Sequence, residues 1–170
     1  KTETVHWHAV FTASRAEKKV RDRLEELGVE CFLPVQTVLR QWTYRKSRVV
    51  VPVIAGLVFV RVGRQEQVKV LQTKGVVAFL RLKGEAGAAV IPDKQMEDFR
   101  FLLDFSEEAV EMTNENIKAG DLVRVVKGSL RGMEGELIRH KGVTKVLVRI
   151  DMLGCAMVNI PASFVEKLNK

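Results

Sequence analysis

The sequence predicts an α+β protein, in which an N-terminal antiparallel sheet flanked by helices is followed by a small C-terminal β-barrel. Strand, helix, several strands and a second helix follow one another over residues 1–105, an order typical of α+β folds. Residues 106–116 are acidic and lack apolar periodicity, which predicts a flexible linker. Residues 117–170 contain short β segments separated by glycines at turn spacing, as in a small barrel.

The first strand and helix are predicted from two local patterns. Alternate apolar residues over 5–11 indicate a half-buried strand. Ser14 and Glu17 have the spacing of a capping box, which predicts a helix from Ser14 to about Leu27. Gly28 then stands where a left-handed residue ends a helix.

The stretch 48–62 is expected to form the centre of the sheet, because it contains eight Val or Ile residues. Pro52 cannot donate to a strand ladder, so two strands should meet near Pro52–Gly56. Residues 30–35 and 75–82 are expected to add strands, and 40–48 to form a hairpin tip.

Two further helices are expected, each from a short apolar pattern. Residues 65–73 are expected to form a short helical segment that carries Val68 and Leu71. Pro92 is suited to the first turn of another helix, whose core side should be formed by Met96, Phe99 and Leu103.

The charges are strongly segregated around a net charge of +7. Residues 31–65 contain six Lys or Arg and no acid, whereas 84–117 contain nine acids and two bases. This pattern indicates a positive surface for a polyanion. Cys31 and Cys155 form no CxxC pair, which favours a reducing cytoplasm, and no window is apolar enough to span a membrane. The first residues show no signal-peptide pattern.

No residue pattern indicates catalysis, a cofactor or a metal. His6 and His8 face the same way on a strand but have no evident third ligand nearby. Cys155 has no activating histidine at motif spacing, and 128–135 lacks the Gly-Lys-Ser/Thr of a phosphate loop. We therefore expect a protein that is not an enzyme.

Two segments together resemble the NusG family of transcription factors. Residues 118–138 resemble a KOW motif, and Trp7–Phe11, the 14–27 helix, Phe32-Leu-Pro and 52–60 resemble the N-terminal NGN domain of that family. The resemblance implies an NGN-like polymerase-binding domain at 1–105 and an SH3-like KOW barrel at 117–170. The motif positions of the KOW segment are Gly120, Asp121, Val123, Val125, Gly128, Gly132 and Gly135.

The resemblance also implies that an apolar depression on the NGN sheet binds the clamp helices of RNA polymerase. The matching residues are Phe11, Ile54, Gly56, Leu57 and Phe59. The segment Ile54-Ala-Gly-Leu-Val-Phe59 departs from the usual family pattern Phe-Pro-Gly-Tyr-x-Phe, so the chain resembles a specialised paralogue. Residues 152–161 are similar to the same part of UpxY-type antiterminators. From the residues alone, plain core and docking surface are equally good readings.

Bases and aromatic residues alternate at the expected hairpin tip, a combination suited to single-stranded nucleic acid. An ordinary solvated loop is the alternative. We expect this tip to contact non-template DNA or nascent RNA near the transcription bubble. The residues of the tip are Arg40, Trp42, Tyr44, Arg45, Lys46 and Arg48. One face of the first helix is a secondary candidate for the same contact, through Arg15, Lys19 and Arg23.

The expected function is a transcription elongation factor that promotes processive elongation or antitermination of particular operons. Its KOW domain would recruit a small ribosomal subunit protein or Rho, the partners that the resemblance implies. The alternative is a ribosome-associated or RNA-binding KOW protein. It explains the charge but gives the apolar face of the N-terminal sheet no purpose.

Overall fold

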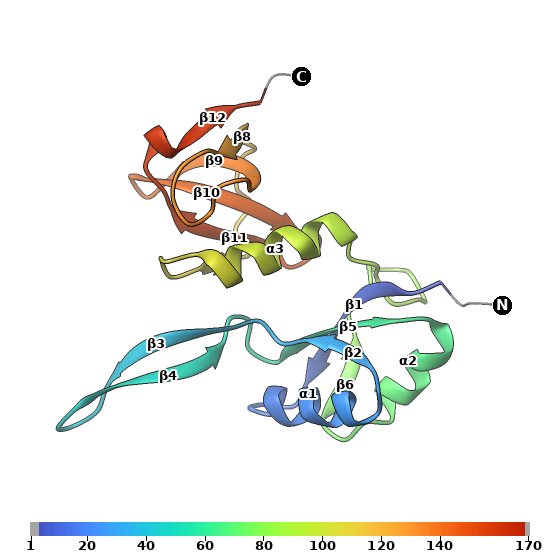
Figure 1. Ribbon diagram of the computed structural model, residues 1–170. Helices are drawn as coiled ribbons and strands as arrows, with labels where there is room; N and C mark the ends of the chain where they lie inside the picture. The colour runs from blue at the N-terminus through green and yellow to red at the C-terminus, as the bar shows by residue number, and fades with distance from the viewer. Residues whose placement is uncertain (1–3, 169–170) are drawn as a thin grey trace. The chain divides into compact units, whose positions relative to one another are not determined.

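The computed structural model describes residues 4–168 and divides into two compact units (Figure 1). One unit contains the chain up to Val35 together with Ile54–Asp93. The other contains Gln36–Val53 together with the chain from Lys94 onward. The domain boundaries expected at 105 and 117 stay a prediction. No helix in the described part of the chain is long and apolar enough to cross a membrane.

The first unit is built on a four-stranded antiparallel sheet of order β2-β5-β1-β6. Its central strands, β1 (His6–Thr12) and β5 (Leu57–Val62), pair from His6–Val62 at one end to Phe11–Leu57 at the other. The outer strands are β2 (Glu30–Phe32) and β6 (Val76–Phe79). The strand expected at 5–11 and a central position for residues 57–62 are confirmed.

Helix α1 (Glu17–Glu26) buries Val20 and Leu24 completely in the core on one face of this sheet. The capping box expected at Ser14 is wrong, because Arg15 has a φ of +59° and the helix begins only after it. The expected end is confirmed: Gly28 has a φ of +76°, and the amide of the next residue donates to the carbonyl of Leu24.

Helix α2 (Arg64–Leu71) covers a shorter stretch than expected and turns a different side inward. Val70 is buried, whereas Val68 and Leu71 are 56% and 47% exposed. The short helix expected at 65–73 is therefore confirmed, but Val68 and Leu71 lie on its exposed side and Val70 reaches the core. The chain reaches β6 through Gly75, whose φ is +98°.

Strand β4 (Lys46–Pro52) does not join the central sheet. It pairs with β3 (Val35–Gln41) in a separate two-stranded ribbon, and the expected break near Pro52–Gly56 is where the chain leaves it. The hairpin expected at 40–48 is confirmed. The expectation that all of 48–62 lies at the centre of one sheet is wrong, since only its second half does.

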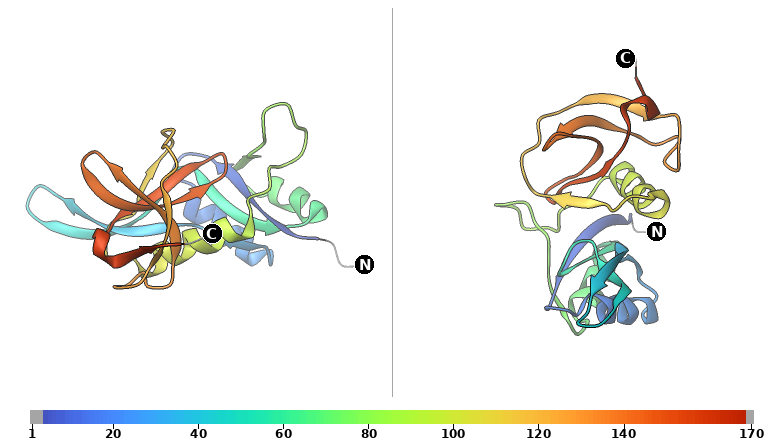
Figure 2. Two further views of the ribbon diagram at one scale, coloured as in Figure 1. Left: turned by 90° about the horizontal axis from the view of Figure 1, so that it is seen from above. Right: turned by 90° about the vertical axis from the view of Figure 1, so that its left-hand side faces the viewer.

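The second unit also contains a six-stranded antiparallel sheet of order β12-β8-β9-β10-β11-β7. Its strands curl around a common interior (Figure 2), but no pairing within residues 4–168 joins β12 to β7, so the closed barrel expected from the sequence is not observed. The longest pairing runs between β10 and β11, from Lys145–Asn159 to Ile150–Gly154. The strands are β7 (Glu111–Thr113), β8 (Asp121–Val125), β9 (Glu134–His140), β10 (Val143–Ile150), β11 (Gly154–Asn159) and β12 (Val165–Lys167).

Helix α3 (Asp93–Phe105) is tied to the turn between β10 and β11. The side-chain amide of Gln95 donates to the Asp151 carboxylate at 2.9 Å and accepts from the Asp151 amide at 2.7 Å. Met96, Phe99 and Leu102 are buried. Leu102 therefore takes the core position that the sequence assigned to Leu103.

The segment expected to be an acidic linker contains strand β7, which pairs with β11. Two of its carboxylates have basic partners: Glu111 lies 2.9 Å from the Lys145 ammonium, and Glu115 lies 3.1 Å from His140 Nε2. These two glutamates are therefore held by contacts within the second unit, which a flexible linker would not provide. The remaining non-strand stretch before β7 is short, running from residue 106 to 110.

Candidate functional site

The candidate polymerase-binding residues of the first unit meet at one end of the β1–β5 pair. Phe11 stands opposite Leu57 in the register, and Ala9 stands opposite Phe59. These side chains share the face opposite Val58 and Val60, which belong to the core packed against α1. The prediction that Leu57 and Phe59 share a face, and that Val58 and Val60 occupy the other, is confirmed.

The turn that carries Ile54 and Gly56 is fixed to the same end of the sheet. The Gly56 amide donates to the Glu17 carboxylate at 2.7 Å, and the Gly56 carbonyl accepts from the Thr12 amide at 2.9 Å. Gly56 has a φ of +72°, a conformation that glycine adopts without strain. Glu17 is 7% exposed, so the first residue of α1 acts as a buried acceptor that positions this turn.

The candidate residues differ sharply in accessibility. Phe11 is 40% exposed and Ile54 is half-buried, but Leu57 and Phe59 are 2% and 0% exposed. The sequence led us to expect an open apolar patch over all of them, and the structure instead buries its middle. One cause lies within the sheet, where Phe32 on β2 pairs with Phe59 and stacks on it with ring centroids 6.3 Å apart.

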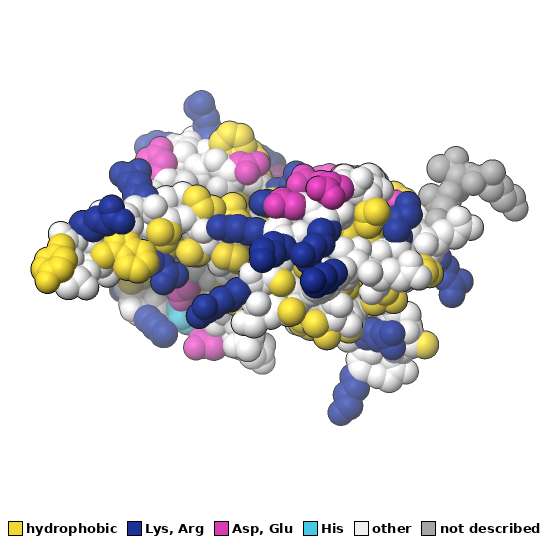
Figure 3. Space-filling view, turned by 90° about the horizontal axis from the view of Figure 1, so that it is seen from below, with side chains coloured by type: hydrophobic (Ala, Val, Ile, Leu, Met, Phe, Trp, Pro, Cys, Tyr) yellow, Lys and Arg dark blue, Asp and Glu magenta, His cyan; other side chains and the backbone are white. Residues whose placement is uncertain are grey.

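The β3–β4 hairpin displays most of the candidate nucleic-acid contacts. Tyr44 is 97% exposed and Trp42 is 48% exposed at the tip, which is closed by the Trp42 amide donating to the Arg45 carbonyl at 2.6 Å. The indole Nε1 of Trp42 donates to the Ser47 hydroxyl. Figure 3 shows Lys and Arg side chains interleaved with apolar ones along the hairpin, toward the left of the view.

The basic residues of the hairpin are divided between its two faces. Extending the Trp42–Arg45 pairing outward places Leu39 opposite Arg48, and both residues line one hollow of the ribbon. Lys46 shares the side of Arg48, while Arg45 lies on the other side. Basic side chains therefore lie on both faces of the ribbon.

The secondary candidates lie in the other unit, on or just before α1. Lys19 and Arg15 are exposed, but Arg23 is half-buried and its guanidinium donates to the Lys74 carbonyl at 2.8 Å. Arg23 therefore has a structural partner already. The structure places these residues in a different unit from the hairpin and does not unite the two groups.

Comparison with known proteins gives the family. The sequence model of the NusG family, described as transcription termination factor nusG, matches residues 5–100, more than half of the chain. The chain belongs to the NusG family. Members of that family are transcription factors and not enzymes. Family membership therefore supports a role in transcription elongation. No curated protein sequence gives a significant match to the chain.

One solved structure has a similar fold. It is a structure of Thermotoga maritima NusG that concerns the interaction of its domains. The two chains are 23% identical, with a TM-score of 0.51 and 98% of each chain covered. The structure of the MjSpt4:Spt5 complex in conformation B is 19% identical over 96% of this chain and 97% of that one. Its TM-score of 0.28 is too low to bear on the fold.

In this NusG-family chain, the glycines of the segment that resembles a KOW motif serve two purposes. Gly128 and Gly132 have φ of +87° and +96° in the turn between β8 and β9. A Cβ on Gly120 would lie 2.1 Å from the Leu137 carbonyl oxygen, and one on Gly135 would lie 2.9 Å from that of Leu147. The first pair therefore turns the chain, and the second pair lets strands approach closely. The other motif residues are buried Val123 and Val125 and exposed Asp121, which lies 3.4 Å from Lys167.

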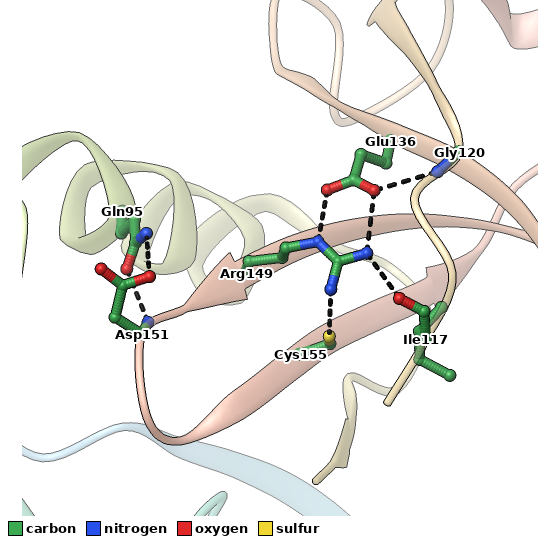
Figure 4. A network of polar contacts seen from close by, with 7 residues as sticks. All are labelled: Gln95, Ile117, Gly120, Glu136, Arg149, Asp151 and Cys155. Carbon is green, nitrogen blue, oxygen red and sulfur yellow. Dashed lines mark hydrogen bonds and ion pairs between the residues drawn. The ribbon is translucent and has the colours of Figure 1, made fainter. Parts of the chain in front are cut away.

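A network around Arg149 joins this segment to the sheet and was missed from the sequence (Figure 4). The guanidinium contacts the Glu136 carboxylate at 2.6 and 3.0 Å and donates to the Ile117 carbonyl at 2.8 Å. Glu136 also accepts from the Gly120 amide at 3.0 Å. Burial by itself would raise the pKa of Glu136, but the hydrogen bonds from Arg149 and Gly120 and the Arg149 charge lower it.

Neither thiol is suited to nucleophilic chemistry. Burial, with the nearby Glu25 charge, raises the pKa of Cys31 to about 11. Burial also raises the pKa of Cys155, and the charge of Arg149 offsets only part of that effect. Both side chains are therefore neutral thiols at neutral pH. Within residues 4–168, no group of three His, Cys, Asp or Glu is placed to hold a metal ion.

Proposed function

We propose that this chain is a non-catalytic transcription elongation factor that binds RNA polymerase in the cytoplasm and promotes processive elongation or antitermination of particular operons. The observation that carries the proposal is the NusG-family match over residues 5–100. The exposed Phe11 at the end of the sheet adds support, because it offers an apolar contact on the segment matched by the family. The departure of 54–59 from the usual family pattern supports a specialised paralogue, and the likeness of residues 152–161 supports one of the UpxY type.

The proposed docking surface is centred on Phe11, with Ile54 and Gly56 at its rim. Leu57 and Phe59 support it from beneath, since both are buried. The clamp helices of polymerase are the proposed partner of this surface. Binding favours processive elongation only where the factor has a higher affinity for the closed, pause-resistant enzyme than for the open one.

The hairpin is the proposed contact with non-template DNA or nascent RNA, with Arg15 and Lys19 as secondary contacts. Residues 117–170 are proposed as an SH3-like KOW domain, supported by the glycine-dependent turn and the curled sheet. Its proposed partners are a small ribosomal subunit protein or Rho.

The docking proposal is tested with Phe11→Asp in a pulldown of RNA polymerase from purified components. A carboxylate in an apolar contact should weaken binding by about tenfold or more. Leu27→Asp is the matched control, because Leu27 is an equally accessible apolar residue of the same unit, 47% exposed. Thermal melts of both variants should match the wild type.

Full polymerase binding by a folded Phe11→Asp variant would refute the docking surface. In a separate pulldown from cell lysate, recovery of ribosomal RNA in place of polymerase by the wild-type chain would favour the alternative of a ribosome-associated or RNA-binding protein.

A further inference from the structure

A pocket of about 460 Å³ opens in the first unit, where β1 begins, α2 begins and the loop after β6 passes. Its volume lies within the roughly 300–1,000 Å³ range of small-molecule sites. His6 pairs with Val62 at the opposite end of β1 from Phe11, so the pocket is distinct from the proposed docking surface. The lining side chains that matter here are His6, His8, Arg64, Gln67, Phe79 and Arg81.

The pocket is electropositive. Arg64 and Arg81 are exposed, and neither has an ion pair or a side-chain hydrogen bond within residues 4–168. None of the described residues that line the pocket is an Asp or a Glu. Two arginines at one pocket are suited to binding a phosphate, because each guanidinium can contact it through two parallel, charge-assisted hydrogen bonds.

The start of α2 adds to this potential. Its N-cap is Gly63, which lines the pocket and has no side chain to satisfy the first amides of the helix. The positive end of the helix dipole therefore stays available to an anion beside Arg64.

A buried histidine supplies a further polar atom and an aromatic wall. His8 is 3% exposed, and its Nδ1 donates to the Ala89 carbonyl at 2.9 Å. Nε2 of His8 has no hydrogen-bond partner in the described chain and is left as an acceptor. The His8 ring packs edge-on against Phe79 at 5.8 Å and against His6 at 6.4 Å, which gives one side of the pocket a ring-lined surface.

We propose that this pocket binds a nucleoside 5′-phosphate. The phosphate lies between Arg64, Arg81 and the first amides of α2, while the base lies against the rings of His6 and Phe79. Nε2 of His8 accepts a hydrogen bond from an amino or imino group of the base. Inorganic phosphate alone would leave the ring-lined side of the pocket unfilled, whereas a nucleotide fills both sides.

The same chemistry occurs in a free mononucleotide and at the 5′-monophosphate end of an RNA, and the test separates the two. The ¹⁵N-labelled full chain is titrated with AMP, GMP, CMP, UMP, guanosine and inorganic phosphate. Saturable shifts of the amides at 63–67 and 79–90 are expected with at least one mononucleotide, and weaker ones with guanosine or phosphate. A 5′-phosphorylated trinucleotide RNA that binds as well as the mononucleotide identifies RNA ends as the source, whereas its failure to bind identifies the free nucleotide.

The arginines are tested with the double variant Arg64→Ala, Arg81→Ala. Its affinity for the best mononucleotide should fall by about tenfold or more, since two charge-assisted contacts are lost. Arg131→Ala is the control, because Arg131 is exposed in the other unit and should leave affinity unchanged. Absence of shifts at 63–67 and 79–90 with every probe, or equal affinity in the double variant, would overturn the proposal.

Discussion

Single residues in this protein act through partners far away in the sequence, which local patterns do not reveal. Ser14 and Glu17 have capping-box spacing, yet the Glu17 carboxylate accepts from the Gly56 amide instead. The positive φ of Arg15 removes Ser14 from the helix and so leaves Glu17 free for that contact. The spacing of Glu136 and Arg149 in the sequence likewise does not predict their contact, because that contact depends on the pairing of β9 with β10.

Glu136 should make the stability of the second unit depend on pH. The pKa of Glu136 is lowered in the folded state, so its ionised carboxylate stabilises the fold. This contribution to the free energy of unfolding is fully present above the ordinary pKa of glutamate, near 4–4.5, and is lost as the pH falls through the folded-state pKa. Glu136→Gln should reduce the free energy of unfolding by about 1–3 kcal/mol at pH 7. The variant should also lose less stability than the wild type between pH 5 and about 3, measured by urea unfolding followed at the Gly120 amide.

The matched control for this prediction is Glu134→Gln on the same strand. Glu134 contacts Arg124 at 3.0 Å, but both side chains are more than 40% exposed, so its loss should cost less than about 1 kcal/mol. Parallel pH curves for wild type and Glu136→Gln would show that the network contributes no charge-dependent stability.

At the scale of elements, strand-forming sequence was predictable and strand partners were not. The Val-rich stretch 48–62 contains two strands with a break at the predicted place, because Pro52 and Gly56 act locally. That β4 pairs only with β3, while β5 enters the central sheet, depends on which chains meet. β propensity describes fit to a pleated surface and is the same for either partner.

The hairpin should supply a salt-dependent part of binding to a transcription complex. Changing Arg40, Arg45, Lys46 and Arg48 together to Gln should weaken binding and lower the slope of log affinity against log salt by up to about 3, as expected for four contacts to a single strand. Binding to polymerase without nucleic acid should change much less. Fluorescence anisotropy over a series of salt concentrations measures both.

The control for the hairpin variant removes the same charge elsewhere. Changing four exposed bases of β9 and the turns beside it to Gln lowers the net charge by the same amount, from +7 to +3, and should leave the salt slope nearly unchanged. The four residues are Lys127, Arg131, Arg139 and Lys141. Equal slopes for wild type and hairpin variant would show the tip to be an ordinary solvated loop.

At the scale of the molecule, the order of elements in the sequence was sufficient to predict an α+β chain with a second, β-rich part. What it did not predict is how the acidic segment divides. Its charges and lack of periodicity are typical of a linker, yet residues 111–113 extend the second sheet because the edge of β11 is available to pair. The Lys145 ammonium then neutralises Glu111, a contact set by tertiary structure alone.

The two predicted domains should fold independently when the chain is cut before β7 rather than after it. A protease site replacing residues 106–109 should release a C-terminal fragment that keeps all six strands and melts cooperatively. A fragment that begins at residue 115 loses the β7–β11 pairing and the Glu111–Lys145 contact, and should be less stable by about 1–3 kcal/mol. Its spectrum should otherwise be preserved, because the interior residues Leu147 and Met157 remain. Denaturant unfolding and ¹⁵N spectra of both fragments measure this. An unfolded longer fragment would show that the C-terminal sheet depends on the rest of the chain and that independent folding is wrong.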